Sequence, residues 1–143
     1  AAAMIICTVE KAKAMGKPYA VIKGIDHRIE THHVTLRDLR RSPSVEIAAE
    51  KAGVHDAPVD VAEIYAPFSH QEIIVKRALG LDDSVAINPS GGVLAGHLFM
   101  ASGLSRVGEV AKRIIAGEYK RGVAHATSGP CLQQNMILVL EGM

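Results

Sequence analysis

Apolar and polar residues alternate in short blocks along the 143-residue chain, which predicts strands alternating with helices. Six apolar or alternating runs, several of them rich in β-branched residues, predict strands at residues 2–7, 19–25, 59–64, 85–87, 123–127 and 136–140. The first of these runs contains Cys7 and is expected to be buried. Because it begins without any lead-in, we expect the chain to be part of a longer protein.

Helices are predicted where apolar residues recur every three or four positions between capping signals. Thr8 is expected to cap a short helix that stops at Gly16. Ser42-Pro43 is expected to start a second helix, which buries one face and ends at Gly53. That face consists of Val45, Ala48, Ala49 and Ala52.

Two further helices follow in the second half of the chain. Ser69 and Glu72 are expected to form a capping box for a helix that ends at Leu79-Gly80. The longest helix is predicted from Leu98 to about Ala116, with Gly117 ending it. Its buried face is expected to comprise Val107, Val110, Ala111, Ile114 and Ile115.

The order of these elements predicts an α/β fold, with helices layered on a mixed β-sheet. Sites in such folds gather beyond the carboxyl ends of the strands. Tyr65, His97 and the turn from Ser128 to Cys131 each come shortly after a predicted strand. We therefore expect these three segments to converge on one site.

The loop from Asn88 to His97 combines several ingredients of a site. Gly91, Gly92 and Gly96 allow backbone conformations closed to other residues and a close approach to a ligand. Together with Asn88, they are candidate substrate-binding residues. An imidazole at the end of such a loop can act as base, acid or hydrogen-bond donor. The alternative is that His97 is a structural histidine.

Composition narrows the function further. The net charge of +1 gives no case for a nucleic-acid partner or a membrane surface, and no apolar run reaches the length of a membrane span. Two cysteines are too few for a disulfide framework, so a reducing, cytoplasmic compartment is expected. Of seven histidines only His32 and His33 are close together, and adjacent residues rarely share a face, so no metal site is expected.

A group of arginines lies in the polar stretch before the second helix, at Arg37, Arg40 and Arg41. Runs of charge of this kind usually form a solvated face, which is the interpretation we favour. Contact with a phosphate group is the alternative.

Three segments, in order, resemble the C-terminal half of a thiolase. Residues 88–92 followed by Gly96-His97 resemble the family's Asn-Pro-x-Gly-Gly and Gly-His-Pro motifs, and residues 101–103 resemble the Ala-Thr-Gly that comes next. Residues 63–68 lie where the family has Glu-Leu-Asn-Glu-Ala-Phe, which makes Phe68 a candidate substrate contact. Residues 128–136 lie where it has Cys-x-Gly-Gly-Gly-Gln-Gly-Met.

The resemblance implies a thiolase C-terminal domain over residues 1–143, with the nucleophilic cysteine in an N-terminal half. It implies an acyltransferase that makes or breaks a carbon–carbon bond at a coenzyme A thioester. Coenzyme A is then a substrate, and no cofactor is implied. The family also implies a homo-oligomer and, in its archaeal-type members, a small partner with an OB-fold and a zinc ribbon.

Departures from the family motifs leave the chemistry open. The catalytic asparagine of the family falls on Tyr65, and its second catalytic cysteine falls on Gly129. Cys131 then matches a glycine whose N–H belongs to an oxyanion hole, whereas a two-residue shift would make Cys131 itself the acid/base. We favour the unshifted match because it keeps the following strand in register.

Three functions remain compatible with these residues. The first is acyl transfer, with His97 as base and oxyanion donor and Tyr65 as hydrogen-bond donor or base. The second is retro-aldol cleavage of a 3-hydroxyacyl-CoA, which fits Tyr65 and the missing cysteine. The third is a non-catalytic scaffold subunit. His125, Gln133 and Gln134 are possible polar neighbours of the site, for which we favour structural roles.

Overall fold

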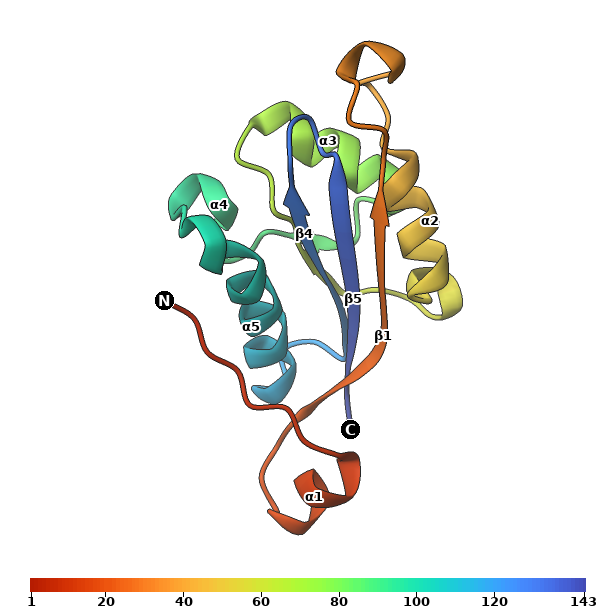
Figure 1. Cartoon of the computed structure of the whole chain (residues 1–143). Helices are drawn as coiled ribbons and strands as arrows, with labels where there is room; N and C mark the ends of the chain where they lie inside the picture. Colours follow the sequence, from red (N-terminus) through yellow and green to blue (C-terminus); the bar gives the residue numbers. More distant parts are fainter.

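A five-stranded mixed sheet runs through the middle of the molecule (Figure 1), in the order β1-β5-β4-β2-β3. The structure is a computed structural model that describes all 143 residues. The strands are β1 (Ala20–Ile29), β2 (Val61–Glu63), β3 (Ala86–Ile87), β4 (Arg121–Ser128) and β5 (Gln134–Gly142). β3, β2 and β4 are parallel, whereas β4, β5 and β1 are antiparallel. The predicted α/β fold with a mixed sheet is confirmed.

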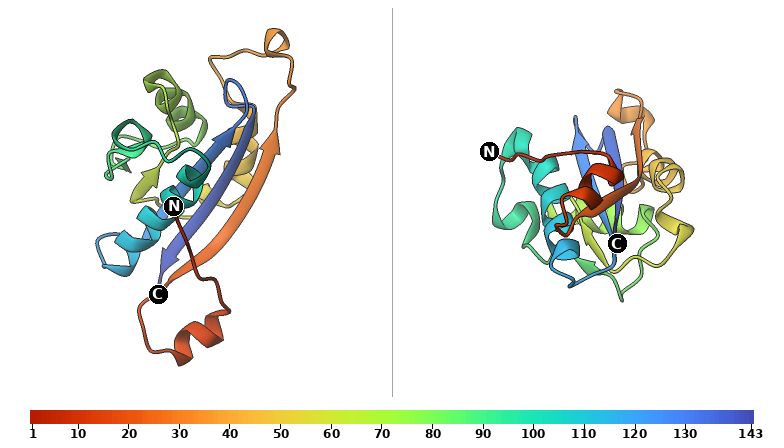
Figure 2. Two further views of the ribbon diagram at one scale, coloured as in Figure 1. Left: turned by 60° about the vertical axis from the view of Figure 1, so that its left-hand side comes forward. Right: turned by 90° about the horizontal axis from the view of Figure 1, so that it is seen from below.

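Helices cover both faces of this sheet (Figures 1 and 2). α2 (Pro43–Lys51) and α3 (Ser69–Ala78) pack on one face and enclose the larger core. α5 (Ser102–Ile115) packs on the other face over a smaller core. Neighbouring strand residues alternate between the two cores, as Ile137 and Leu138 of β5 do, so the strands read as continuous apolar runs.

The N-terminal segment corrects one prediction. Residues 2–7 form no strand, and the segment lies outside the two helical layers, followed by α1 (Val9–Ala14) beyond the end of the sheet (Figure 1). Ile5 is 94% exposed, and Cys7 is exposed rather than buried. No backbone hydrogen bond involves residues 1–7, and an apolar run without a neighbouring strand has nothing to pair with. Thr8 caps α1 as predicted, accepting a hydrogen bond from the Lys11 N–H at 3.3 Å.

The helix predicted from Leu98 is also corrected, because it begins at Ser102. Two short elements precede it, α4 (Gly92–Ala95) and the 3-10 turn η3 (Phe99–Ala101). Phe99 has a φ of 49°, a left-handed conformation that interrupts a helix. Ile115 is 44% exposed, since one further residue turns the chain about 100° away from the buried Ile114.

The side-chain caps predicted for α2 and α3 do not form. Ser69 is already helical and caps nothing, and Glu72 instead accepts a hydrogen bond from the Asn88 amide at 2.5 Å. α2 begins at Pro43 and ends before Gly53 as predicted, but the Ser42 hydroxyl makes no cap. The Glu30 carboxylate accepts from the Ser44 N–H at 3.2 Å in its place. The two remaining elements are the 3-10 turns η1 (Val34–Leu36) and η2 (Val54–Asp56).

Candidate active site

Three segments meet beyond the carboxyl ends of the parallel strands. Tyr65 follows β2, the loop ending at His97 follows β3, and the turn at residues 129–133 follows β4. Because these strands run in the same direction, their ends share one edge of the sheet. A pocket of about 460 Å³ opens there, and Tyr65, His97 and residues 128–131 all line it. The predicted convergence is confirmed, and Phe68 also lines the pocket.

Tyr65 and His97 form the closest polar contact between two walls of the pocket. The Tyr65 hydroxyl lies 2.8 Å from His97 Nε2, and either group can donate, depending on the imidazole tautomer. The Phe99 ring meets the imidazole edge-on, with ring centroids 4.6 Å apart. His97 is exposed, so the pair combines an accessible imidazole with a phenol that fixes one of its nitrogens. Such a pair can accept or deliver a proton.

The glycine-rich loop is held by hydrogen bonds of Asn88 to neighbouring segments and by the conformations of its glycines. Asn88, with φ 48°, accepts from the Ile64 N–H at 2.7 Å and donates to Glu72. Gly91 and Gly92 have φ of 87° and 62°, values that favour glycine. Neither these residues nor Gly96 lines the pocket. They belong to the loop that leads to His97, and their contact with substrate stays a prediction.

A buried ion pair under this loop was missed by the sequence reasoning. Glu63 Oε2 lies 2.7 Å from Arg106 Nη1, and both side chains are almost fully buried. Glu63 also accepts from the Ser90 N–H at 3.0 Å and the Ser90 hydroxyl at 2.8 Å. The sequence contained one indication of this pair. Glu63 and Arg106 carry opposite charges, and the strand and helix patterns place both positions in the interior.

The hairpin turn between β4 and β5 forms the opposite wall of the pocket. Gly129, Cys131 and Leu132 all have positive φ, at 75°, 53° and 58°. Gly129 brings no side chain, and the Cys131 thiol is exposed. The N–H groups of Cys131, Leu132 and Gln133 donate to no atom of the chain. The turn therefore offers free backbone donors beside a pocket, an arrangement that suits an anion.

Arg37 corrects the prediction of a solvated arginine group. Arg40 is solvated, with 87% of its side chain exposed, and Arg41 is exposed as well. The Arg37 side chain is only 4% exposed, since it pairs with Glu30 at 2.9 Å and donates to the carbonyl oxygens of the turn. The sequence places all three in one polar stretch, so only the fold separates Arg37 from the others.

His125 lies beneath the site rather than in it. It is fully buried, its Nε2 lies 3.0 Å from Asn135 Oδ1, and its Nδ1 has no partner in the chain. Burial lowers the pKa of His125 to about 4, and the Asn135 hydrogen bond opposes that shift. Its backbone oxygen accepts from the Tyr65 N–H at 3.3 Å. His125 thus supports Tyr65 through the main chain.

No group of three or more histidine, cysteine, aspartate or glutamate side chains is arranged to hold a metal ion. None of the helices has the length and apolar character needed to cross a bilayer.

The chain is similar in sequence to known proteins. A family model described as "Thiolase, C-terminal domain" matches residues 17–140. An acetyl-CoA acetyltransferase of Methanocaldococcus jannaschii is 31% identical, with 77% of this chain and 35% of the relative covered. A 3-ketoacyl-CoA thiolase of Acinetobacter baumannii is 31% identical over 72% of this chain and 27% of its own length. A beta-ketoadipyl-CoA thiolase of Pseudomonas putida is 30% identical over 99% of this chain and 35% of its own. The chain thus spans about a third of the curated relatives that it matches.

Proposed function

The chain belongs to the thiolase family, and we propose that it supplies the acid–base and oxyanion part of an active site for acyl-CoA substrates. The whole protein makes or breaks a carbon–carbon bond at a coenzyme A thioester, as an acyltransferase. Its nucleophilic cysteine comes from a part outside residues 1–143. The observation that carries this proposal is the contact of Tyr65 with His97 at 2.8 Å, in the pocket shared with the 129–133 turn.

In the first step, His97 takes the proton of the nucleophilic thiol, and the thiolate attacks the thioester carbonyl. The developing oxyanion accepts hydrogen bonds from preorganised N–H groups. The carbon–sulfur bond to coenzyme A then breaks, and the leaving thiolate takes the proton back from His97. This chemistry requires an imidazole that is open to the pocket, which matches the exposure of His97.

In the second step, a base removes the α-proton of a second acyl-CoA, and the enolate carbon attacks the carbonyl of the acyl-enzyme. The carbon–sulfur bond to the nucleophilic cysteine then breaks, and the cysteine leaves as a thiolate that takes up a proton. Gly129 has no group that can act as this base. Tyr65 and Cys131 both line the pocket and are the two candidates. We favour Tyr65, because its hydroxyl already lies within hydrogen-bond distance of an imidazole that can take up its proton. The N–H of Cys131 then serves as a donor to the enolate oxygen.

A second candidate function rests on the same phenol. In a retro-aldol cleavage of a 3-hydroxyacyl-CoA, Tyr65 or His97 accepts the proton of the β-hydroxyl. The Cα–Cβ bond breaks to give a carbonyl compound and an acyl-CoA enolate, and the enolate is then protonated. This reaction needs neither a nucleophile nor a second cysteine, and so fits Tyr65 and Gly129. Loss of catalysis, with the chain acting as a scaffold, is the remaining alternative.

The test uses the full-length natural protein that contains these residues. Thiolysis of acetoacetyl-CoA by coenzyme A and cleavage of a 3-hydroxyacyl-CoA are assayed separately. His97→Ala should lower turnover by about 10²–10⁴ and leave coenzyme A binding nearly unchanged, because the lost group moves protons and stabilises charge. His55→Ala is the control, since His55 is exposed and precedes β2 at the other end of the sheet. Equal turnover in His97→Ala and the control would contradict the proposal.

Tyr65→Phe and Cys131→Ser identify the second base. A loss of a factor of about 10² or more in Tyr65→Phe alone assigns the role to Tyr65, and the same loss in Cys131→Ser alone assigns it to Cys131. Activity only on the 3-hydroxyacyl-CoA would establish the lyase. Absence of both activities in the wild-type protein would leave a non-catalytic scaffold role as the remaining function.

The partners follow from the same proposal. Apolar side chains are exposed on β1 and on the rim of the pocket, among them Ile25, Ile29, Phe99 and Met100. Exposed apolar surface of this kind supports packing against the N-terminal half and self-association of the protein. The small OB-fold and zinc-ribbon partner rests on the family resemblance alone and stays a prediction.

A further inference from the structure

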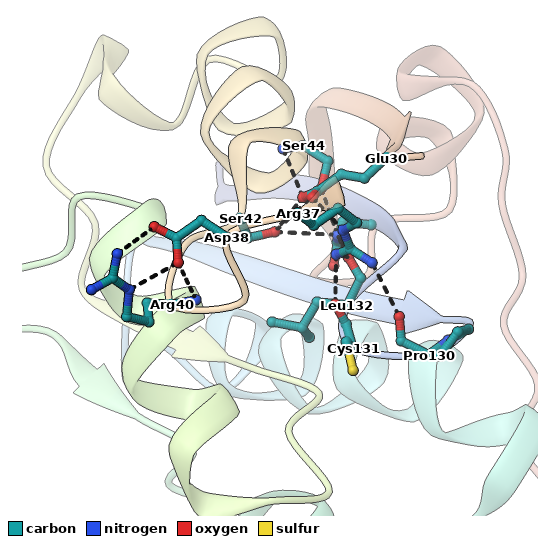
Figure 3. A network of polar contacts seen from close by, with 10 residues as sticks. Glu30, Arg37, Asp38, Arg40, Ser42, Ser44, Pro130, Cys131 and Leu132 are labelled. Atoms are coloured by element: carbon teal, nitrogen blue, oxygen red, sulfur yellow. Dashed lines mark hydrogen bonds and ion pairs between the residues drawn. The ribbon is translucent and has the colours of Figure 1, made fainter. Parts of the chain in front are cut away.

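Four successive carbonyl oxygens of the 129–133 turn point toward Arg37 and Glu30. The Arg37 guanidinium donates to those of Pro130 (3.3 Å), Cys131 (2.6 Å) and Leu132 (3.3 Å), as Figure 3 shows. The Gln133 oxygen accepts from the Glu30 N–H at 2.8 Å. Arg37 and its ion-pair partner Glu30 thus bind all four of these carbonyl oxygens.

This orientation fixes the opposite side of each peptide. No peptide bond of the chain is cis, and in a trans peptide the N–H points away from the carbonyl oxygen. The N–H groups of Cys131, Leu132 and Gln133 therefore point away from Arg37. None of them has an acceptor in the chain, and residues 130–132 line the pocket. A cation on the carbonyl side also polarises each peptide, which strengthens its N–H as a donor.

The position of Arg37 is fixed by a network of hydrogen bonds around its partner Glu30. Its Nε donates to Glu30, which also accepts from the hydroxyls of Ser42 (3.1 Å) and Ser44 (2.6 Å). Burial raises the pKa of the Glu30 carboxyl, but these hydrogen bonds and Arg37 outweigh it, so the pKa is lowered and the carboxylate stays charged. Asn135 supports the turn from β5, donating to Leu132 O at 2.8 Å and Ser44 Oγ at 2.7 Å.

We propose that Arg37 is a positioning residue for the oxyanion site: it holds and polarises the peptides after Pro130 and Cys131, so that their N–H groups face the substrate oxygen. Arg37 does not touch the substrate. This inference rests on the proposed function and adds a specific determinant to it. It concerns a side chain whose neighbours in sequence, Arg40 among them, are solvated.

The experiment compares Arg37→Met with Arg40→Met in the full-length natural protein. Arg40 is the matched control, since it lies in the same stretch and pairs only with Asp38. Arg37→Met should lower kcat about 10- to 100-fold with KM within about threefold, because the donors are weakened rather than removed. The kcat–pH profile should keep its shape, since a positioning residue exchanges no proton with the substrate. Arg40→Met should behave as wild type.

Arg37→Lys is measured in parallel and covers the case in which Arg37→Met does not fold. An ammonium cannot reproduce the fork that reaches Glu30 and three carbonyls together, so kcat should fall by about three- to tenfold. An Arg37→Lys protein with wild-type kcat would overturn the inference. A loss confined to KM would overturn it as well.

A crystal structure of Arg37→Met separates this inference from the proposed function. If the wild-type protein turns over neither substrate, the proposed function fails, and the structure alone decides about Arg37. A turn whose carbonyls at residues 130–132 rotate away from position 37 supports the positioning role. A turn that stays unchanged without the guanidinium rejects it.

Discussion

Both walls of the pocket rest on an arginine–carboxylate pair, but the two pairs differ in their surroundings. Glu63 and Arg106 join β2 to α5 beneath the His97 loop, and their side chains are 0% and 5% exposed. Glu30 and Arg37 lie against the 129–133 turn, and their side chains are 12% and 4% exposed. The first pair holds its loop at one residue, through the N–H and hydroxyl of Ser90, whereas Arg37 of the second pair holds three successive carbonyl oxygens of the turn.

The difference indicates separate roles for similar chemistry. A pair buried between a strand and a helix has lost its water on all sides, so removing one partner leaves an uncompensated charge in the core. Glu30 keeps some contact with water, at 12% exposure, so it can be solvated further when Arg37 is removed. We therefore expect Glu63–Arg106 to govern stability and Glu30–Arg37 to govern the direction of backbone donors.

The largest effect on stability is expected from Arg106→Met. It leaves Glu63 charged and buried, which should lower the free energy of unfolding by about 3–5 kcal/mol in urea titrations. Arg113→Met is the matched control on the same helix, because its partner Glu118 is half exposed. That change should cost less than about 1 kcal/mol. Equal losses in the two variants would remove the distinction between a buried and a peripheral pair.

A titration of stability sharpens the comparison, because the buried His125 contacts Asn135, which in turn donates to Leu132 of the 129–133 turn. The pKa of His125 is near 4 in the folded state, below its ordinary value of 6.5. Its contribution to stability is therefore complete above pH 6.5 and is lost as the pH falls toward 4. The loss should be on the order of 3 kcal/mol.

His125→Gln tests this assignment, since an amide does not titrate. In this variant, stability measured by urea unfolding should be flat between pH 6.5 and about 4.5. Below that, carboxylates with lowered pKa, such as Glu30, begin to lose their own contributions. A slope as steep as that of the wild type would show that another group is responsible.

The smallest effects come from single methyl groups in the two loops. Gly129→Ala keeps a φ of 75° and brings Cβ within 2.6 Å of Gln133 Oε1, so it should cost roughly 1–2 kcal/mol. Gly96→Ala, in the His97 loop, has ordinary φ and meets no atom within 4 Å. Its cost in thermal unfolding should stay below about 0.5 kcal/mol. A larger loss in Gly96→Ala than in Gly129→Ala would show that the His97 loop is the more constrained of the two.

Local patterns in the sequence were enough for most elements of the fold. The start of α2 at Pro43 and its end before Gly53 depend on local residues, a proline in the first turn and a glycine with positive φ after the last. The order of strands and helices was enough to place Tyr65, His97 and the 128–131 turn at one edge, because parallel strands end on the same side.

Partners far away in the sequence decided the rest. Residues 2–7 have a strand pattern but no neighbouring strand, and pairing cannot be deduced from an apolar run by itself. Glu72 serves Asn88 instead of a cap, and Arg37 is buried only because a turn more than 90 residues away presents three carbonyls to it. The sequence by itself determined the layered α/β fold and the convergence of Tyr65, His97 and the turn after β4 on one pocket. Only the tertiary structure decided which charges are buried and which way the backbone donors point, because both depend on groups that folding brings together.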